Sequence, residues 1–132
     1  MANKYHNRAF TCNGIRWDSE KEWYRYQYLL QAQKQGAISN LERQVTFELI
    51  PAVTEEVIIQ LKTKVKTKTR TVQQPVTYTC DFRYTQADGT VVIEDVKADP
   101  KMLPKEYVLK KKMMRALLGI KIREVYNATE KI

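Results

Sequence analysis

The chain has 132 residues, enough for one domain around one hydrophobic core. It contains 23 Lys and Arg against 15 Asp and Glu, and this formal charge of +8 indicates a polyanionic partner such as nucleic acid. Its 2 Cys are too few for a disulfide framework or a zinc motif, and no stretch resembles a signal peptide or a membrane span. We therefore expect a single domain, residues 1–132, that is soluble and cytoplasmic.

The first part of the chain predicts a flexible arm followed by a helix. Residues 1–13 are polar and have no apolar period, which is typical of a frayed terminus. A helix is expected over residues 19–36, because Ser19 and Glu22 fit a capping box in which the Glu22 carboxylate bonds back to the Ser19 amide. Its apolar side chains recur at helical spacing at Trp23, Tyr26, Leu29 and Leu30.

Residues 38–50 predict a strand. Val45, Phe47 and Leu49 alternate with polar residues until Pro51 ends the pattern. Gln44 stands at the start of this alternation, and its simplest role is that of a hydrogen-bonding residue at the entrance of a strand.

Residues 54–74 form a basic extension with a regular charge pattern. A cation occupies every second position, at Lys62, Lys64, Lys66, Lys68 and Arg70. As a strand, this segment would carry its cations on one face over roughly 27 Å and span several phosphates of a DNA strand. Two alternatives stay open: a solvated edge strand whose lysines prevent aggregation, and a short helix over residues 57–61.

Residues 76–97 predict a β-hairpin that carries acids, and its loop admits two registers. A three-residue loop with Gly89 in the left-handed conformation places Asp81 opposite Asp95, and we favour it because glycine suits that conformation. Glu94 then lies among apolar residues on the other face, where an unpaired acid is costly. A two-residue loop would instead bring Asp81 to the face of Glu94.

Asp81 opposite Asp95 predicts a metal site. Opposed side chains have Cβ atoms roughly 4.5–5.5 Å apart, so the two carboxylates repel unless a proton or a cation neutralises them. Oxygen ligands favour Mg²⁺ or Mn²⁺, and the chain's single histidine, His6, is distant in sequence. Such a site suits phosphodiester hydrolysis, in which Lys97 would orient the attacking water or stabilise the transition state.

The last part of the chain predicts a helix and a strand. Pro104 is placed to begin a helix that runs to about residue 118, with Lys110 and Lys111 on its basic side as further DNA contacts. Residues 120–125 then predict a strand. A right-handed strand–helix–strand crossover makes it parallel to the strand that ends at residue 97, which predicts an α/β fold with a mixed sheet.

The ordered set of motifs resembles a nuclease superfamily. Asp81 followed by Asp95-Val96-Lys97 is similar to the D…(D/E)xK signature of the PD-(D/E)xK nucleases, with Cys80 where that superfamily usually has Pro. The chain also resembles the DUF1064 group of phage and prophage proteins, regarded as akin to Holliday junction resolvases. The matching segments are 17–22, 40–44, 78–82, 94–97 and the basic helix that follows them.

This resemblance implies a restriction-endonuclease-like core of the order α-β-β-β-α-β, flanked by helices and interrupted by the basic extension. It implies a protein encoded by a phage or prophage. It also gives Glu22 a second interpretation, as a helix-borne metal ligand beside Asp81 and Asp95. It places Gln44 near the site, and Glu94 becomes an alternative second acid.

We therefore expect a Mg²⁺- or Mn²⁺-dependent DNA endonuclease that acts on branched DNA during phage recombination. The expected catalytic residues are Asp81, Asp95, Lys97 and Glu22, and the three acids would hold the metal. The alternative is a nucleic-acid-binding protein with an inactive nuclease-like site. A homodimer is also expected, because paired cuts in two strands need two sites and one small domain has room for one.

Overall fold

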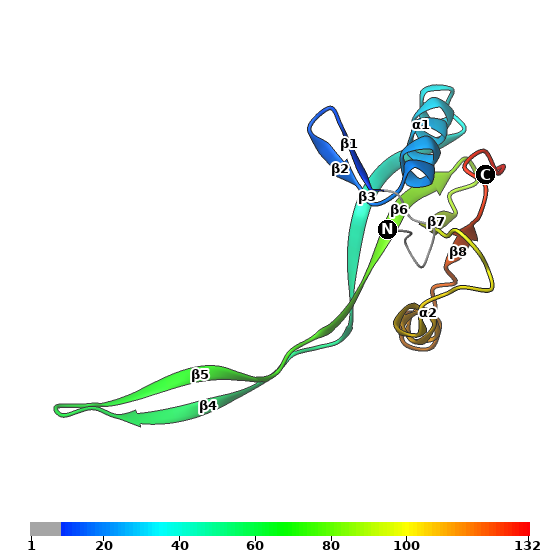
Figure 1. The fold of residues 1–132 in the computed structure, drawn as a ribbon. Coiled ribbons are helices and arrows are strands. Elements are labelled where there is room, and N and C mark those ends of the chain that lie inside the picture. Colours follow the sequence, from blue (N-terminus) through cyan, green and yellow to red (C-terminus); the bar gives the residue numbers. More distant parts are fainter. Residues whose placement is uncertain (1–8) are drawn as a thin grey trace.

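The computed structural model describes residues 9–132, which form an α/β body with a projecting arm (Figure 1). The helices are α1 (Glu20–Lys34) and α2 (Lys105–Leu118). The strands are β1 (Phe10–Cys12), β2 (Ile15–Trp17), β3 (Ile38–Ile50), β4 (Val53–Gln60), β5 (Val65–Gln73), β6 (Val76–Gln86), β7 (Val91–Val96) and β8 (Arg123–Val125).

The central sheet is mixed, as the sequence predicted. Its order is β3-β6-β7-β8, in which β3, β6 and β7 are antiparallel neighbours and β8 is parallel to β7. The chain passes from β7 to β8 through α2, which Gly119 ends in the left-handed conformation at φ 69°. Figure 1 shows α1 and α2 on opposite sides of this sheet, so both of its faces are covered.

Two hydrophobic clusters form the core, one under each helix. On the α1 side, Leu29 packs with Phe82 and Tyr84, whereas on the α2 side Met114 packs with Tyr78 and Cys80. All six side chains are at most 5% exposed. The sheet is therefore the central layer of the body, and α1 and α2 are its two covers.

Helix α1 begins where the capping signal placed it, since the Ser19 hydroxyl accepts the Glu22 backbone N–H at 3.1 Å. Its buried stripe differs from the prediction. The buried residues are Glu22, Arg25, Leu29 and Ala32, so two charged side chains occupy positions that an apolar count ignores. Both find polar partners inside the protein, which removes the usual cost of burying a charge.

In β3 and in β6, the alternation of side chains between the two faces of the sheet is interrupted, and the two interruptions lie opposite each other. Alternate residues of a regular strand lie on one face, yet Leu41 packs in the α1 cluster and Val45 in the α2 cluster. In β6, Cys80 belongs to the α2 cluster and Phe82 to the α1 cluster. The interruptions lie at Gln44, which has φ 51°, and at Asp81 across the pair.

The β6–β7 hairpin has the three-residue loop, so the favoured register is confirmed. Phe82 pairs with Glu94 and Tyr84 with Val92, a register that brings the preceding Asp81 next to Asp95. Gly89 has φ 89° and donates its N–H to the Gln86 carbonyl at 2.9 Å. A side chain at this φ would be strained, so the glycine sets the register.

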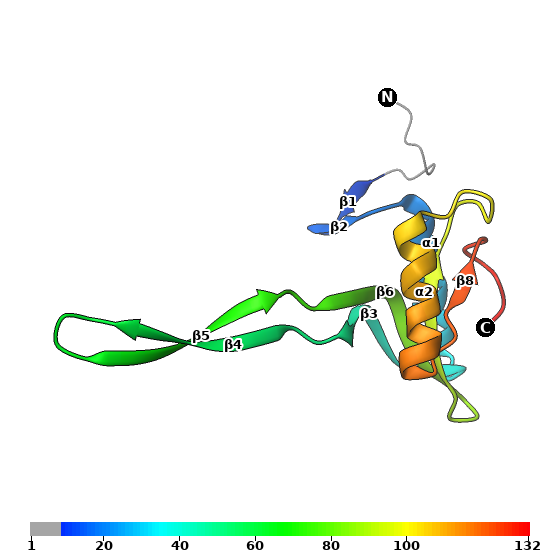
Figure 2. The ribbon, with the colours of Figure 1, turned by 90° about the horizontal axis from the view of Figure 1, so that it is seen from below.

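Strands β4 and β5 form a two-stranded arm that extends away from the body (Figures 1 and 2). Lys66 pairs with Ile59 and Lys68 with Val57, and the Leu61 N–H donates to the Lys64 carbonyl at 2.8 Å. The short helix considered for residues 57–61 was therefore wrong, because this stretch pairs as a strand. The single row of five cations was also wrong, because Lys62 and Lys64 lie in the turn.

The flexible arm expected over residues 1–13 lies largely outside the described residues. Residues 10–12 form β1, which pairs with β2 through Cys12 and Ile15 around Gly14 at φ 77°. The sequence prediction missed this hairpin because strands of three residues are too short to show a period. In the described part of the chain, no helix is long and apolar enough to cross a membrane.

Candidate active site

Asp81 lies where the alternation of side chains in β6 is interrupted, and contacts with two neighbouring segments hold its carboxylate. One of its carboxylate oxygens accepts the backbone N–H of Val96 at 2.8 Å, and the other lies 3.4 Å from the amide nitrogen of Gln44. Gln44 is close because the interruptions in β3 and β6 lie side by side. Asp81 as a whole residue is half-buried.

Glu22 reaches the same place from the first turn of α1. The Gln44 amide nitrogen that approaches Asp81 also donates to a Glu22 carboxylate oxygen at 3.1 Å. One amide therefore joins the two carboxylates. Of the two interpretations of Glu22, the structure places its carboxylate toward the site, while its backbone N–H remains capped by Ser19. Glu22 is 3% exposed.

Asp95 at the end of β7 and Lys97 directly after it line a cleft. The Tyr78 hydroxyl donates to Asp95, and the Lys97 Nζ lies 3.4 Å from the same carboxylate. The Lys97 ammonium also lies 3.6 Å from the centroid of the Tyr107 ring. These four residues line a cavity of about 380 Å³ between the start of α2 and β6, in which a ligand would meet an acid and a cation together.

Burial and neighbouring acids raise the pKa values of Glu22 and Asp81. Burial raises the pKa of Glu22 to about 7, with the charges of Asp18 and Asp95 adding to the rise and Arg43 opposing it. Burial, followed by the charge of Asp95, raises the pKa of Asp81 well above its usual range. The site therefore contains more negative charge than its own cations offset, and a bound proton or added cation would relieve it.

The donor set fits a hard divalent cation. The side chains of Glu22, Asp81 and Asp95 offer carboxylate oxygens, which Mg²⁺ and Mn²⁺ prefer as ligands. A divalent cation between these carboxylates would also offset the repulsion between their negative charges. As they stand, no three Asp, Glu, His or Cys side chains within residues 9–132 are arranged to hold a metal ion. The Gln44 amide is the present shared partner of Glu22 and Asp81.

These pKa shifts predict that the metal-free protein loses stability as the pH rises. A carboxyl whose pKa is raised by folding stabilises the folded state below its unfolded pKa, and this contribution is lost as the pH rises through its folded pKa, about 7 for Glu22. We expect the Tm in EDTA to fall by about 5 °C or more between about pH 5 and pH 8. Glu22→Gln should flatten the decline. A wild-type Tm that stays constant over this pH range in EDTA would mean that folding does not raise the pKa values of these carboxyls.

Glu94, considered as an alternative to Asp95 as the second acid of the site, forms an ion pair with Arg25 on the other side of the sheet. It is 0% exposed on the α1 side of β7, where the Arg25 guanidinium donates to both of its oxygens at 2.8 and 2.6 Å. The Tyr84 hydroxyl also donates to it, and an Arg123 nitrogen lies 3.6 Å away. Arg25 further contacts the carbonyl of Ala128 at 3.2 Å. Glu94 thus joins α1, the sheet and the C-terminal segment.

Glu94→Gln is therefore expected to destabilise the fold. It should lower the free energy of unfolding by about 3–5 kcal/mol, because it leaves Arg25 buried without its counter-charge. Urea unfolding measures this loss. The control is Glu42→Gln, which breaks an exposed pair with Arg83 at 2.8 Å and should cost about 0–1 kcal/mol. Equal losses for the two variants would contradict a structural role for Glu94.

The predicted DNA-binding cations are divided among three places. Lys62, Lys64, Lys66, Lys68 and Arg70 belong to the arm and are exposed, although Arg70 pairs with Glu55 through an Nε–Oε1 contact of 2.7 Å. Lys110 lines the cleft and pairs with Glu106 at 2.9 Å. Lys111 lies on another face of α2 and pairs with Glu124 at 2.9 Å.

Sequence reasoning missed two tyrosines of the site. Tyr78 binds Asp95, and the Tyr107 hydroxyl donates to Glu124 at 2.6 Å while its ring contacts Lys97. Tyr78 lies in the segment that precedes Asp81, and Tyr107 lies in the first turn of the basic helix. Both tyrosines therefore lie in segments that the sequence had already linked to the site. What the sequence did not show is that the two rings meet, with centroids 6.3 Å apart.

Comparisons with known proteins place the chain in a family. Neither the curated proteins nor the solved structures contain a match to it. One family model, described as "Protein of unknown function (DUF1064)", matches residues 2–128. That range covers nearly the whole chain, including the arm, the cleft and all of the site residues. The chain therefore belongs to the DUF1064 family.

Proposed function

We propose that this protein is a Mg²⁺- or Mn²⁺-dependent DNA endonuclease that hydrolyses phosphodiester bonds. The observation that carries the proposal is the meeting of Glu22, Asp81 and Asp95 from α1, β6 and β7, with the pKa of Glu22 raised to about 7 by burial and neighbouring acids. A passive phosphate-binding site gains nothing from acids, since they repel the ligand. Acids beside Lys97 suit a site that binds a cation and phosphate together.

The order of the elements supports a PD-(D/E)xK nuclease core. With the arm and the β1–β2 hairpin left aside, the body reads α1–β3–β6–β7–α2–β8, which is the order α-β-β-β-α-β of that superfamily. Asp81 lies within β6, Asp95 lies at the end of β7 and Lys97 directly follows β7, the positions of the acids and the lysine in the D…(D/E)xK signature. The arm is then an insertion between the first two strands of the core.

Each site residue has a distinct proposed role. Asp81, Asp95 and Glu22 hold the cation, which when bound supplies an activated water and neutralises charge on the phosphate. Lys97 orients the attacking water and stabilises charge on the phosphate through its ammonium, which Asp95 at 3.4 Å and the Tyr107 ring at 3.6 Å keep in the cleft. Gln44 holds the carboxylates of Glu22 and Asp81 in place before the cation arrives.

A second candidate is a DNA-binding protein whose nuclease-like site is inactive. The observation that favours it is that, among the residues described, the acids are not arranged as they stand to hold a metal ion. The basic arm would serve such a protein equally well.

Incubation with DNA of several shapes distinguishes the two functions. Plasmid, linear duplex, single-stranded and four-way-junction DNA are each mixed with the protein in Mg²⁺, in Mn²⁺ and in EDTA. The endonuclease predicts cleavage of at least one shape that requires the cation and is absent with Asp81→Asn. Binding without cleavage of any shape would favour the inactive site.

Tyr107 provides a test of how Lys97 is positioned. Tyr107→Phe removes the bond to Glu124 but keeps the ring beneath the Lys97 ammonium, so kcat should fall by about threefold or less. Tyr107→Leu also removes the cation–π contact and should lower kcat by about tenfold with little change in KM. Steady-state cleavage kinetics measure both. If the two variants lost equal activity, the ring would not position Lys97.

A further inference from the structure

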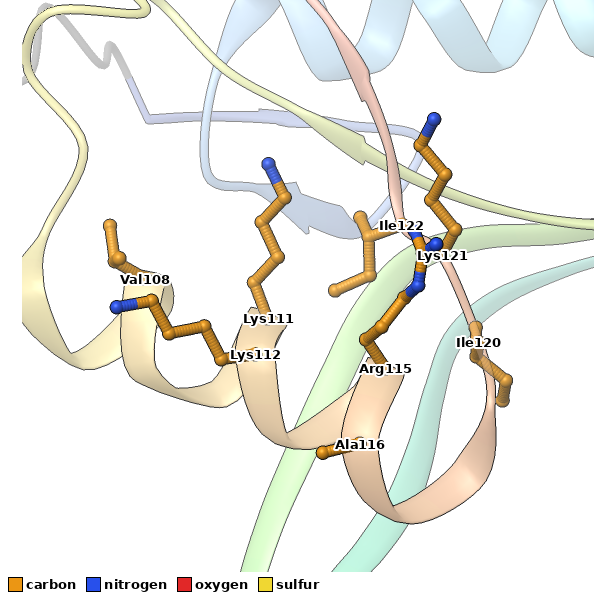
Figure 3. A pocket seen from close by; sticks show the side chains of 8 residues that line it. All are labelled: Val108, Lys111, Lys112, Arg115, Ala116, Ile120, Lys121 and Ile122. Carbon is orange, nitrogen blue, oxygen red and sulfur yellow. The ribbon is translucent and has the colours of Figure 1, made fainter.

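A second pocket is lined by α2 residues other than those that line the cleft. Figure 3 shows its side chains. The pocket is a cavity of about 540 Å³ between α2 and residues 120–122, which lead into β8. Val108, Ala116, Ile120 and Ile122 give it an apolar lining. Its other lining residues are four cations, Lys111, Lys112, Arg115 and Lys121, and none of the acids within residues 9–132 lines it.

Three of these cations have no counter-charge in the part of the chain that the structure describes. Lys111 pairs with Glu124 at 2.9 Å. Within residues 9–132, by contrast, no ion pair or side-chain hydrogen bond engages Lys112, Arg115 or Lys121. Figure 3 shows Arg115 extending from α2 and Lys121 from the segment after it. The pocket therefore combines an apolar surface with unpaired positive charge, and its ligand must carry both an apolar part and an anion.

The net charge and the size of the pocket narrow the choice of ligand. A second copy of this chain, with its charge of +8, is repelled by these cations. The cavity of about 540 Å³ falls within the size range of sites for small ligands, which are mostly apolar with a few polar groups. A nucleotide has the required parts, since its base offers a flat apolar face and its phosphate an anion. A base inside a duplex is stacked and cannot enter a pocket, so the nucleotide must be unpaired.

We propose that this pocket binds an unpaired nucleotide of a single DNA strand, with its base on the apolar lining and its phosphate on Lys112, Arg115 and Lys121. The inference rests on the proposed nuclease function and adds a substrate class, DNA with an unpaired strand near the cut. Contacts join the pocket to the cleft. Lys111 binds Glu124, which accepts the hydroxyl of Tyr107, whose ring contacts Lys97.

The test measures the affinity for oligothymidylate and for an abasic oligonucleotide of equal length. Ala116→Phe fills the pocket without changing its charge, and Leu109→Phe is the control because Leu109 is 59% exposed on α2 outside the pocket. We expect the wild type and Leu109→Phe to bind oligothymidylate about tenfold more tightly than the abasic strand. Ala116→Phe should abolish that difference and leave duplex binding unchanged.

A charge variant tests the phosphate contact separately. Replacing Lys112, Arg115 and Lys121 by Gln should weaken oligothymidylate binding about tenfold or more relative to the exposed control set Lys34, Lys101 and Lys131, which removes the same net charge. Equal affinity of the wild type for the two oligonucleotides, or equal losses in the two charge sets, would overturn the proposal. Cleavage by the wild type separates the nucleotide pocket from the nuclease function. If the wild type cuts DNA but shows either of these results, the pocket proposal alone is refuted. If the wild type neither binds nor cuts any DNA, the pocket and the nuclease function are both refuted.

Discussion

Asp81→Asn and Asp95→Asn are each expected to lower the rate of DNA cleavage at least about a thousandfold, while the protein stays folded and binds DNA as tightly as before. Each change removes one of the carboxylates that hold the cation and reduces the negative charge of the site. Binding is spared because removing an acid does not weaken the attraction for phosphate. Asp81→Asn should also stabilise the metal-free protein at neutral pH, since the pKa of this carboxyl is raised by burial and by Asp95.

The control for these variants is Asp88→Asn. Asp88 lies in the β6–β7 loop, where its carboxylate accepts the Thr90 N–H at 2.9 Å and is exposed to solvent. The Asp88→Asn variant removes the same charge from the same hairpin but should leave the cleavage rate unchanged. Cleavage and DNA binding are measured for all three proteins. If Asp81→Asn or Asp95→Asn cut DNA at the wild-type rate, these acids would not form the catalytic site.

Replacing Lys64, Lys66 and Lys68 of the arm by Ser is expected to weaken binding to every DNA shape. Each phosphate contact contributes about 0.9 to the slope of log K against log salt, so losing three should lower that slope by roughly 2–3. At low salt, this corresponds to a loss of affinity of about a hundredfold or more. The fold should not change, because these side chains are exposed and the arm lies outside both core clusters.

The comparison that decides this prediction is a matched set of cations elsewhere. Lys34, Lys101 and Lys131 are also exposed, and replacing them by Ser removes the same net charge without touching the arm. This set should lower the salt slope by less than about 1. A slope that falls equally in both sets would mean that the arm provides only general positive charge. An unchanged slope in the arm variant would make its lysines a solvated edge that prevents aggregation.

Local sequence signals predicted the frame of the fold well. Ser19 marked the start of α1, Gly119 the end of α2, and Gly89 the loop that brings Asp81 next to Asp95. Each of these residues acts through its own backbone or its immediate neighbours. The parallel pairing of β8 with β7 was also predictable, because the handedness of the crossover leaves one arrangement.

The polar interior of the protein was not predictable from local patterns. The hairpin pattern indicated that Glu94 needs a partner, but it did not identify Arg25, which lies 69 positions away in the sequence. Gln44 appeared to be an ordinary strand residue, but the interruption in β3 at its positive φ turns it toward Glu22 and Asp81. These contacts depend on how distant segments pack, and a period of 2 or 3.6 residues carries no information about them.

Anomalous scattering from a crystal grown with Mn²⁺ tests the central claim most directly. We expect one strong manganese peak in contact with the carboxylates of Asp81 and Asp95, with Glu22 beside it. We also expect this peak to be absent from crystals of the Asp95→Asn variant grown in the same solution. A wild-type crystal with no manganese at these three carboxylates, or a peak that persists unchanged in Asp95→Asn, would mean that these acids do not form a cation site.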